Sequence, residues 1–170
     1  MESKLETSRF VLKSIIPRKD SFENYLSWMK NKEANPFILG VSENLTEQDL
    51  VSYVSEKNDS VTALLLGIFV KLDKIHIGNV KLEQIILGKS AAIGILIGEE
   101  SWRGKGVGFE VITRVLEFCF VDLQVKIVEL GVNKKNLRAI NLYKRLGFTE
   151  NTQKSNSHES IRMSISKIPL

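Results

Sequence analysis

Apolar residues recur with two different periods along the chain, and the period distinguishes strands from helices. Alternating or continuous apolar positions predict strands, whereas apolar positions three or four residues apart predict helices. The predicted strands are 7–16, 62–71, 74–87, 90–98, 126–133, 148–152 and 160–168. The predicted helices are 20–31, a segment that begins after Thr46, a segment that begins after Gly106, and 136–146. Because strands and helices are interleaved, the pattern predicts a mixed α/β fold.

Two helix boundaries carry local signals of their own. Thr46 with Asp49 three residues later resembles a capping box, with Asp in the place of the usual Glu or Gln. Gly147 follows the last predicted helix, and glycine commonly ends helices. No linker rich in Ser, Gly or Pro divides the chain, so we expect a single domain over residues 1–170.

Composition limits the classes of protein to consider. The 170 residues are 43% hydrophobic and 26% charged, which is typical of a globular domain. A net charge of +4, spread along the chain, does not indicate nucleic-acid binding. The apolar runs are too short to span a membrane and the N-terminus lacks a signal-peptide core, so we expect a cytoplasmic protein. With Cys119 as the single cysteine, we expect neither a disulfide nor a bound metal.

A glycine-rich segment from Gly98 to Gly108 joins a predicted strand to a predicted helix. Glycines at such a junction leave backbone N–H groups open to an anion, and the helix dipole favours negative charge there. Arg103 and Lys105 add positive charge to the segment. The segment is therefore a candidate site for a phosphate or pyrophosphate, although it can also be a turn that only begins the helix.

Two common phosphate-binding motifs do not fit this segment. Counted from Gly98, the P-loop pattern has Arg103 at its second glycine, and no Ser or Thr follows Lys105. Counted from Gly104, the dinucleotide-binding pattern has Phe109 at its last glycine. We therefore reject both motifs.

A third pattern fits. Arg103-x-x-Gly106-x-Gly108 resembles the acetyl-coenzyme-A loop, [RQ]-x-x-G-x-[GA], of the GNAT superfamily of N-acetyltransferases. Residues 136–148, N-L-R-A-I-N-L-Y-K-R-L-G-F, closely resemble the second signature of that superfamily, N-x-x-A-I-x-L-Y-x-x-x-G-F. The predicted strand 126–133 lies between the two signatures, as the fold of the superfamily requires.

The resemblance implies an α/β GNAT (acyl-CoA N-acyltransferase) fold, with a strongly bent mixed sheet that is splayed between its fourth and fifth strands and flanked by helices, about four in number. In this chain those strands are 90–98 and 126–133. The resemblance also implies direct transfer of an acetyl group from acetyl-CoA, held in the split, to a primary amine in a ternary complex. The residues that it implies for acetyl-CoA binding are Leu96, Ile97 and Gly98 along the pantetheine, Arg103, Gly104, Lys105, Gly106, Val107, Gly108 and Phe109 in the pyrophosphate loop, and Asn136.

Tyr143 matches the tyrosine that protonates the leaving thiolate in the superfamily. A phenol has an ordinary pKa of about 10 and a thiol of about 8.5, so this proton transfer is uphill unless the site lowers the phenol pKa. Tyr143 also shares helical spacing with Ile140 and Leu146, as a core residue would. Asn136 likewise has two compatible interpretations, a helix N-cap and a cofactor contact.

The base that deprotonates the acceptor ammonium is less clear. Some relatives carry a Glu twelve residues before the tyrosine, where this chain has Gly131, and others carry an acid near the position of Ala92. Glu129 shares a strand face with Gly131 and is our candidate catalytic base. The alternatives are Asn133, Glu83, Glu99 and a chain of water molecules.

The acceptor is indicated only in outline. Residues 25–37, with Trp28 and Phe37, resemble a region of two subgroups that acetylate ribosomal-protein N-termini and amino-sugar nucleotides. We expect Trp28 to pack its helix on the sheet rather than to line the acceptor site. The expected partner is a small-molecule or peptide amine, with a homodimer left open and with neither nucleic acid nor membrane as a partner. An alternative is a noncatalytic regulatory module that binds acetyl-CoA.

Overall fold

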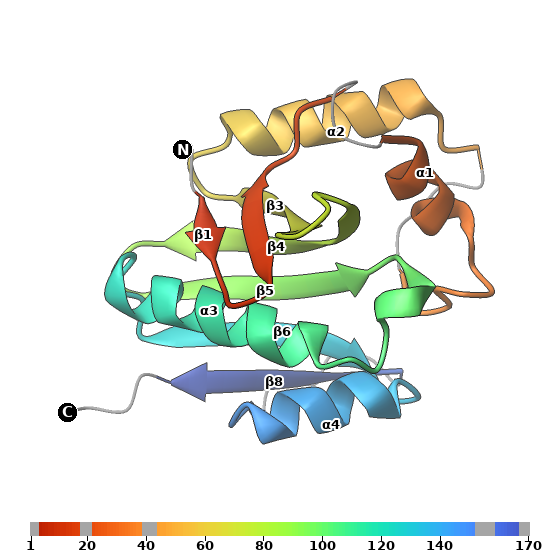
Figure 1. Cartoon of the computed structure of the whole chain (residues 1–170). Helices are drawn as coiled ribbons and strands as arrows, with labels where there is room; N and C mark the ends of the chain where they lie inside the picture. Colours follow the sequence, from red (N-terminus) through yellow and green to blue (C-terminus); the bar gives the residue numbers. More distant parts are fainter. Residues whose placement is uncertain (1–3, 18–21, 39–43, 152–158, 167–170) are drawn as a thin grey trace.

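The computed structural model describes residues 4–17, 22–38, 44–151 and 159–166 (Figure 1). Of the predicted element boundaries, residues 20, 152 and 168 lie outside these ranges. The strands are β1 (Leu5–Glu6), β2 (Phe10–Ser14), β3 (Leu64–Val70), β4 (His76–Ile86), β5 (Ser90–Ile97), β6 (Ile127–Asn133), β7 (Thr149–Glu150) and β8 (Ser160–Ser166). The helices are α1 (Phe22–Lys30), α2 (Glu47–Asp59), the short 3₁₀ helix η1 (Glu100–Trp102), α3 (Val107–Val121) and α4 (Leu137–Arg145).

The local signals in the sequence form as predicted. The Thr46 hydroxyl accepts a hydrogen bond from the Asp49 amide at 3.2 Å, and the Asp49 carboxylate accepts one from the Thr46 amide at 2.9 Å. This capping box begins α2. Gly147 follows α4 with a φ of 94°, a left-handed conformation that suits glycine. The structure adds β1, whose two residues are too few to leave a periodic pattern.

The eight strands form one mixed sheet in the order β1-β2-β3-β4-β5-β6-β8-β7. Helices lie on both of its faces (Figure 1). Helices α3 and α4 share the larger hydrophobic core with apolar residues from both halves of the sheet. Helices α1 and α2 form a smaller core with Leu65 of β3 and Leu96 of β5 on the other face. No described residue of β6 or β8 belongs to that smaller core, so α1 and α2 cover only part of their face.

The sheet opens between β5 and β6. Strands β4 and β5 are antiparallel and pair along nearly the whole of β5. Strands β5 and β6 are parallel and pair only from Ser90–Ile127 to Ala92–Glu129. Beyond Ala92 and Glu129 each strand continues without the other. The predicted split between these two strands is therefore confirmed.

The described residues contain no membrane-spanning helix, no metal-binding cluster and no reactive cysteine. Within the described ranges, no helix is long and apolar enough to cross a bilayer, and no group of three or more His, Cys, Asp or Glu side chains is placed to hold a metal ion. Cys119 is fully buried on α3, and this burial raises the pKa of its thiol to about 12. The thiol is therefore protonated and inert at neutral pH.

Candidate active site

The glycine-rich loop presents open backbone amides at the start of α3. Gly104 and Gly106 both have a φ of 75°, which only glycine adopts without strain. The first amide of α3 that donates within the described part of the chain is that of Glu110, to the Gly106 carbonyl at 3.1 Å. The amides of Val107 and Gly108 come before it and are left at the helix N-terminus, where the dipole favours an anion. The local structure thus offers the backbone groups that an anion would need, and anion binding here stays a prediction.

Protein contacts fix this loop from two sides. A Cβ on Gly108 would lie 2.8 Å from Leu142 Cδ2, so the Leu142 side chain on α4 packs against this glycine and would have to shift for a larger residue. On the other side, the Arg9 amide and guanidinium donate to the Glu110 carboxylate at 2.8 and 2.7 Å. Burial raises the pKa of Glu110, but hydrogen bonds from Thr7 and Arg9 outweigh it and the net pKa is lowered. Glu110 is therefore ionised at neutral pH and holds the first turn of α3 to the β1–β2 hairpin.

Arg103 points back into the protein. Its guanidinium donates to the carbonyls of Ile97 at 2.9 Å, Ala34 at 2.7 Å and Gly98 at 3.2 Å, and to the side-chain oxygen of Asn35 at 2.7 Å. These four bonds tie the loop to the end of β5 and to the segment after α1. The sequence predicts a phosphate contact for Arg103, but the guanidinium is already committed to these partners. Its role in the structure is to position the loop.

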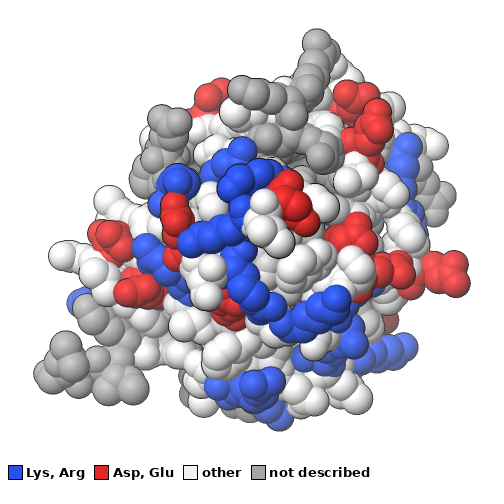
Figure 2. All heavy atoms as spheres, in the orientation of Figure 1, with Lys and Arg blue, Asp and Glu red and all other residues white. Residues whose placement is uncertain are grey.

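Other basic side chains lie nearer the open side of the loop. Lys105 remains exposed, with its ammonium 5.7 Å from the centre of the Trp102 ring. Arg138 of α4 lies beside Gly104, because a Cβ there would be 3.9 Å from Arg138 Nη2. Arg138 is absent from the predicted set of cofactor contacts. Seen from the side of α3, Lys and Arg side chains form an interrupted band down the middle of the molecule (Figure 2). This charge favours an anionic ligand.

The backbone of β5 offers hydrogen-bonding groups to the split at alternate residues. The Gly98 amide donates to the Ile77 carbonyl at 3.0 Å, so Gly98 and, by antiparallel alternation, Leu96 bond towards β4. Ile95 and Ile97 therefore turn their backbone groups the other way, towards the gap beside β6. Of the three residues predicted to bind pantetheine, only Ile97 has this orientation. Ile95 was not predicted and shares it.

Tyr143 and Asn136 belong to α4. Tyr143 is 7% exposed, and its ring makes an edge contact with Phe148 at 5.6 Å between centroids. Burial raises the pKa of its hydroxyl to about 12. The Asn136 side-chain oxygen accepts from the Ala139 amide at 3.2 Å, which confirms the N-cap and does not use the side-chain nitrogen. Tyr143 is therefore a core residue by its ring, and its hydroxyl has no hydrogen-bond partner among the described residues.

Two of the candidate bases differ in how their charges are satisfied. Glu83 on β4 accepts from Lys57 at 3.1 Å and from Lys81 at 2.7 Å. Burial raises its pKa, but the two lysines outweigh this effect, and the net pKa of Glu83 lies below its usual value. A carboxylate held in this way is a weak base. Glu99, after β5, accepts from the Ser101 hydroxyl at 3.1 Å.

Glu129 lies half-buried on β6 at the base of the split. It is in register with Ala92, the last β5 residue that pairs with β6. Its neighbours on the same face of β6 are Gly131 and Asn133. A Cβ on Gly131 would meet nothing within 4 Å, so the face of β6 is open at this position, two residues beyond Glu129. The Asn133 side-chain oxygen accepts from the Lys135 amide at 2.9 Å and serves the following turn.

Trp28 packs α1 on the end of β5, as the sequence predicts. It is 7% exposed, and a Cβ on Gly98 would overlap its indole ring. The ring also lies 5.1 Å from the buried His76 ring. Phe37, after α1, is 37% exposed and does not belong to either core.

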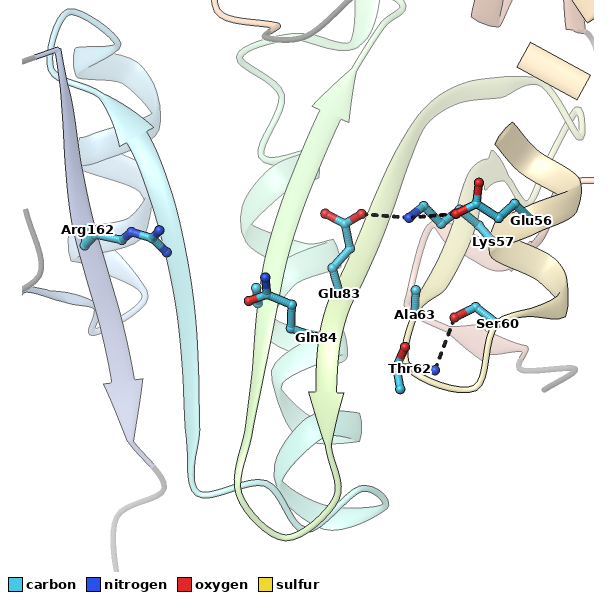
Figure 3. A pocket seen from close by; sticks show the side chains of 9 residues that line it. Glu56, Lys57, Ser60, Thr62, Ala63, Glu83, Gln84 and Arg162 are labelled. Carbon is cyan, nitrogen blue, oxygen red and sulfur yellow. Dashed lines mark hydrogen bonds and ion pairs between the residues drawn. The ribbon is translucent and has the colours of Figure 1, made fainter. Parts of the chain in front are cut away.

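A cavity of about 450 Å³ lies on the part of the sheet that α1 and α2 leave uncovered (Figure 3). Its walls come from the end of α2, the connection between α2 and β3, and strands β4, β5 and β8. Ala92 is one of its lining residues, so the cavity reaches the base of the split. The cavity leaves no signal in the sequence, because its lining combines residues within 56–63, 83–84 and 92 with the distant Arg162.

The parallel strands β5 and β6 part beyond Ala92 and Glu129, and the glycine-rich start of α3 lies in the connection between them. The fold and site thus define an α/β protein whose split sheet lies beside a helix N-terminus suited to an anion. The chain matches the family model of the acetyltransferase (GNAT) domain over residues 9–149. The chain therefore belongs to the GNAT acetyltransferase family, which confirms the resemblance found in the sequence.

Comparisons with individual proteins agree with this family. The chain is 34% identical over 84 residues to the "Probable N-acetyltransferase YjcK" of Bacillus subtilis, a match that covers 48% of this chain and 46% of the relative. Over 82 residues it is 34% identical to the N-acetyltransferase MJ1207 of Methanocaldococcus jannaschii, covering 48% of this chain and 34% of the relative. Each match thus spans less than half the length of the relative.

Solved structures share the fold. Spermidine N-acetyltransferase from Vibrio cholerae, in complex with CoA and spermine, has a TM-score of 0.79 at 22% identity, covering 94% of this chain and 96% of that one. The microcin C7 self-immunity acetyltransferase MccE, in complex with acetyl-CoA and AMP, has a TM-score of 0.77 at 18% identity, covering 94% and 93%. At these identities the likeness shows the fold alone.

Proposed function

We propose that the chain transfers an acetyl group from acetyl-CoA to a primary amine by direct attack while both substrates are bound. The observation that carries the proposal is the opening of the sheet between β5 and β6, where the Ile95 amide and carbonyl and the Ile97 amide have no partner among the described residues. The Ile97 carbonyl accepts from Arg103. The loop with open amides follows β5 directly. Membership of the GNAT family supports acetyl-CoA as the donor.

In this proposal the cofactor is held mainly by backbone. The amides of residues 104–109 take the pyrophosphate at the start of α3. The pantetheine adds to the free edge of β5 like a strand, through Ile95 and Ile97. An amide at this edge also polarises the thioester oxygen. Lys105, Arg138 and the Asn136 side-chain nitrogen supply further contacts from the loop and α4.

Tyr143 serves as the acid towards the leaving thiolate. A pKa of about 12 keeps its hydroxyl protonated throughout the neutral range. Complete proton transfer to a thiolate, whose conjugate thiol has a pKa of about 8.5, is then unfavourable. Tyr143 therefore acts chiefly by donating a hydrogen bond to the sulfur as negative charge develops there.

Glu129 serves as the base in this proposal. It lies at the base of the split, whereas Glu83 is neutralised by two lysines and Glu99 lies beyond the end of β5. The open face of β6 at Gly131 gives an acceptor amine room close to Glu129. The base then receives the proton that the ammonium loses before or during attack.

A thermal-shift measurement with acetyl-CoA tests the first half of the proposal. A ligand that binds only the folded state stabilises it by about 2.7 kcal/mol at 100 times its Kd, so a clear rise in Tm is expected. If saturating acetyl-CoA produces no rise in Tm, the proposal is overturned.

Thiol release from acetyl-CoA with a panel of amines tests the second half. Tyr143→Phe is expected to lower kcat by about 100-fold with little change in acetyl-CoA binding. Tyr25→Phe is the matched control, because Tyr25 is equally buried but lies on α1. Acetyl-CoA binding with no thiol release from any amine would instead support the noncatalytic regulatory module.

A further inference from the structure

The cavity on the uncovered part of the sheet adjoins the place where the acceptor must enter. Ala92 lines it and is also the last residue of β5 that pairs with β6. An amine that reaches a thioester in the split from this face would leave the rest of its molecule in the cavity. The lining of the cavity therefore bears on what kind of acceptor fits.

The acidic side chains around the cavity are largely satisfied. Glu83 is bridged by Lys57 and Lys81, at 3.1 and 2.7 Å. Glu56 lies 3.9 Å from the Lys57 ammonium and is 76% exposed, so its charge is screened by solvent. Neither carboxylate is therefore a strong attractor for a second cationic group of an acceptor.

Arg162 is the basic lining residue without such a carboxylate bridge, and its side chain is exposed to solvent. It lies on β8 and lines the cavity from the side opposite Glu83 and Lys57 (Figure 3). No described residue forms an ion pair with its guanidinium. Its strand position is directly opposite Gly131, whose missing side chain leaves the space between Arg162 and the split open.

From these contacts we infer that Arg162 binds an oxyanion at the far end of the acceptor. The acceptor class is then a primary amine that carries a carboxylate or a phosphate, and this inference rests on the proposed acetyl transfer. The planar guanidinium presents paired N–H donors that match both anions. Adjacent strands lie about 4.8 Å apart, so Arg162 on β8 is roughly 5–10 Å from the split beside β6. A short, flexible or compact acceptor spans that distance.

The experiment compares amines that differ only in this anion. The pairs are 6-aminohexanoate with 6-aminohexanamide, and 5-aminopentyl phosphate with 5-aminopentanol. Thiol release gives kcat/KM for each, and wild type is expected to prefer an anionic member by at least about ten-fold, the value of one charge-assisted hydrogen bond. The pair with the larger ratio identifies carboxylate or phosphate. Equal kcat/KM within both pairs would overturn the inference.

Two variants assign the preference to the residue. Arg162→Gln is expected to lower the anionic-to-neutral ratio at least ten-fold, mainly through KM. Arg114→Gln is the matched control, since Arg114 lies on α3 and pairs with Glu117. It should leave the ratio unchanged. An unchanged ratio in Arg162→Gln would contradict the assignment.

A binding measurement separates this inference from the proposed function. Calorimetry with the CoA complex of the protein measures the affinity of 6-aminohexanoate and 5-aminopentyl phosphate without turnover. At least one is expected to bind, and Arg162→Gln is expected to weaken it about ten-fold or more. Normal acetyl-CoA binding with no affinity for either anion overturns the inference and leaves the proposed function standing. Failure to bind acetyl-CoA overturns the proposed function itself.

Discussion

The two sides of the split between β5 and β6 present different groups, backbone on one side and side chains on the other. The proposed cofactor side consists mainly of backbone: the loop amides at the start of α3 and the edge of β5 at Ile95 and Ile97. The acceptor side consists of side chains from α2, β4, β6 and β8, including Glu83, Glu129 and Arg162. A backbone site needs a contiguous stretch with a particular conformation, whereas a side-chain site needs only that distant elements meet in register.

The two sides also differ in how their charges are satisfied. At the loop, unpaired amides and basic side chains are left for an anion. On the acceptor side, the charge of Glu83 is already balanced by two lysines. Arg162 is the charged lining residue that has no ion pair among the described residues. Changes at the loop should therefore have large effects on cofactor binding, and changes on the acceptor side should have smaller effects that depend on the substrate.

The largest expected effect comes from Gly106→Val. At a φ of 75° a β-branched residue is strained by about 1–3 kcal/mol, so the loop rearranges and its amides lose their common orientation. We expect acetyl-CoA to bind about 100-fold more weakly, measured by calorimetry, which corresponds to about 2.7 kcal/mol.

A matched variant separates this local effect from general strain. Gly88 has a φ of 69° in the turn between β4 and β5, and a Cβ there would meet nothing within 4 Å. Gly88→Val introduces a similar backbone strain and should lower Tm about as much as Gly106→Val does. Its affinity for acetyl-CoA should equal that of wild type. Equal losses of affinity in both variants would show that the loop has no special role.

Glu129→Gln has the next largest expected effect. If Glu129 accepts the proton of the acceptor ammonium, its loss should lower kcat/KM by about 10- to 100-fold and change the low-pH limb of the rate profile. Acetyl-CoA affinity should not change, because the variant lies on the acceptor side. Retained activity with an unchanged pH profile would contradict the assignment, and the same measurement on Glu99→Gln tests the competing candidate.

Glu83→Gln should affect stability modestly. The variant leaves Lys57 and Lys81 without their shared carboxylate, at a cost of about 1 kcal/mol for a partly solvent-screened network. The pKa of Glu83 is lowered in the folded state, so this stabilisation is present above the ordinary value of 4.5 and is lost as pH falls through the lowered value. Urea unfolding at pH 7 and pH 3 should show a smaller difference from wild type at pH 3 than at pH 7.

A surface pair provides the control for this stability effect. Glu117 lies 3.4 Å from Arg114 on α3 and is 62% exposed. Glu117→Gln should change the free energy of unfolding by less than about 0.5 kcal/mol at either pH. If Glu83→Gln changes the free energy of unfolding as little as Glu117→Gln does, the ion bridge on the acceptor side adds no stability.

The sequence carries clearer signals for the proposed cofactor side than for the proposed acceptor side, for the same structural reason. Gly104, Gly106 and Gly108 record backbone conformations and close contacts directly, so the loop can be recognised from a few letters. The partners of Arg103 cannot be recognised from the sequence, because Ala34 and Asn35 come nearly 70 residues earlier in the chain. Strand pairing is equally hidden from the sequence.

The choice between neighbouring residues of β5 illustrates this limit. The sequence places Leu96, Ile97 and Gly98 together as cofactor contacts, but pairing with β4 decides which of them faces the split. The Gly98 amide is taken by Ile77. The ion bridge of Glu83 and the position of Arg162 opposite Gly131 depend in the same way on register and on packing between distant segments.

Amide hydrogen exchange along β5 tests the central claim most directly, because it reports each backbone group separately. In the free protein we expect the amides of Leu96 and Gly98 to exchange slowly, since they bond towards β4, and those of Ile95 and Ile97 to exchange quickly. Saturating acetyl-CoA should slow exchange at Ile95 and Ile97 by at least about ten-fold, as expected for new hydrogen bonds at the strand edge. Unchanged exchange at Ile95 and Ile97 with acetyl-CoA bound would contradict the account of the split as the cofactor site.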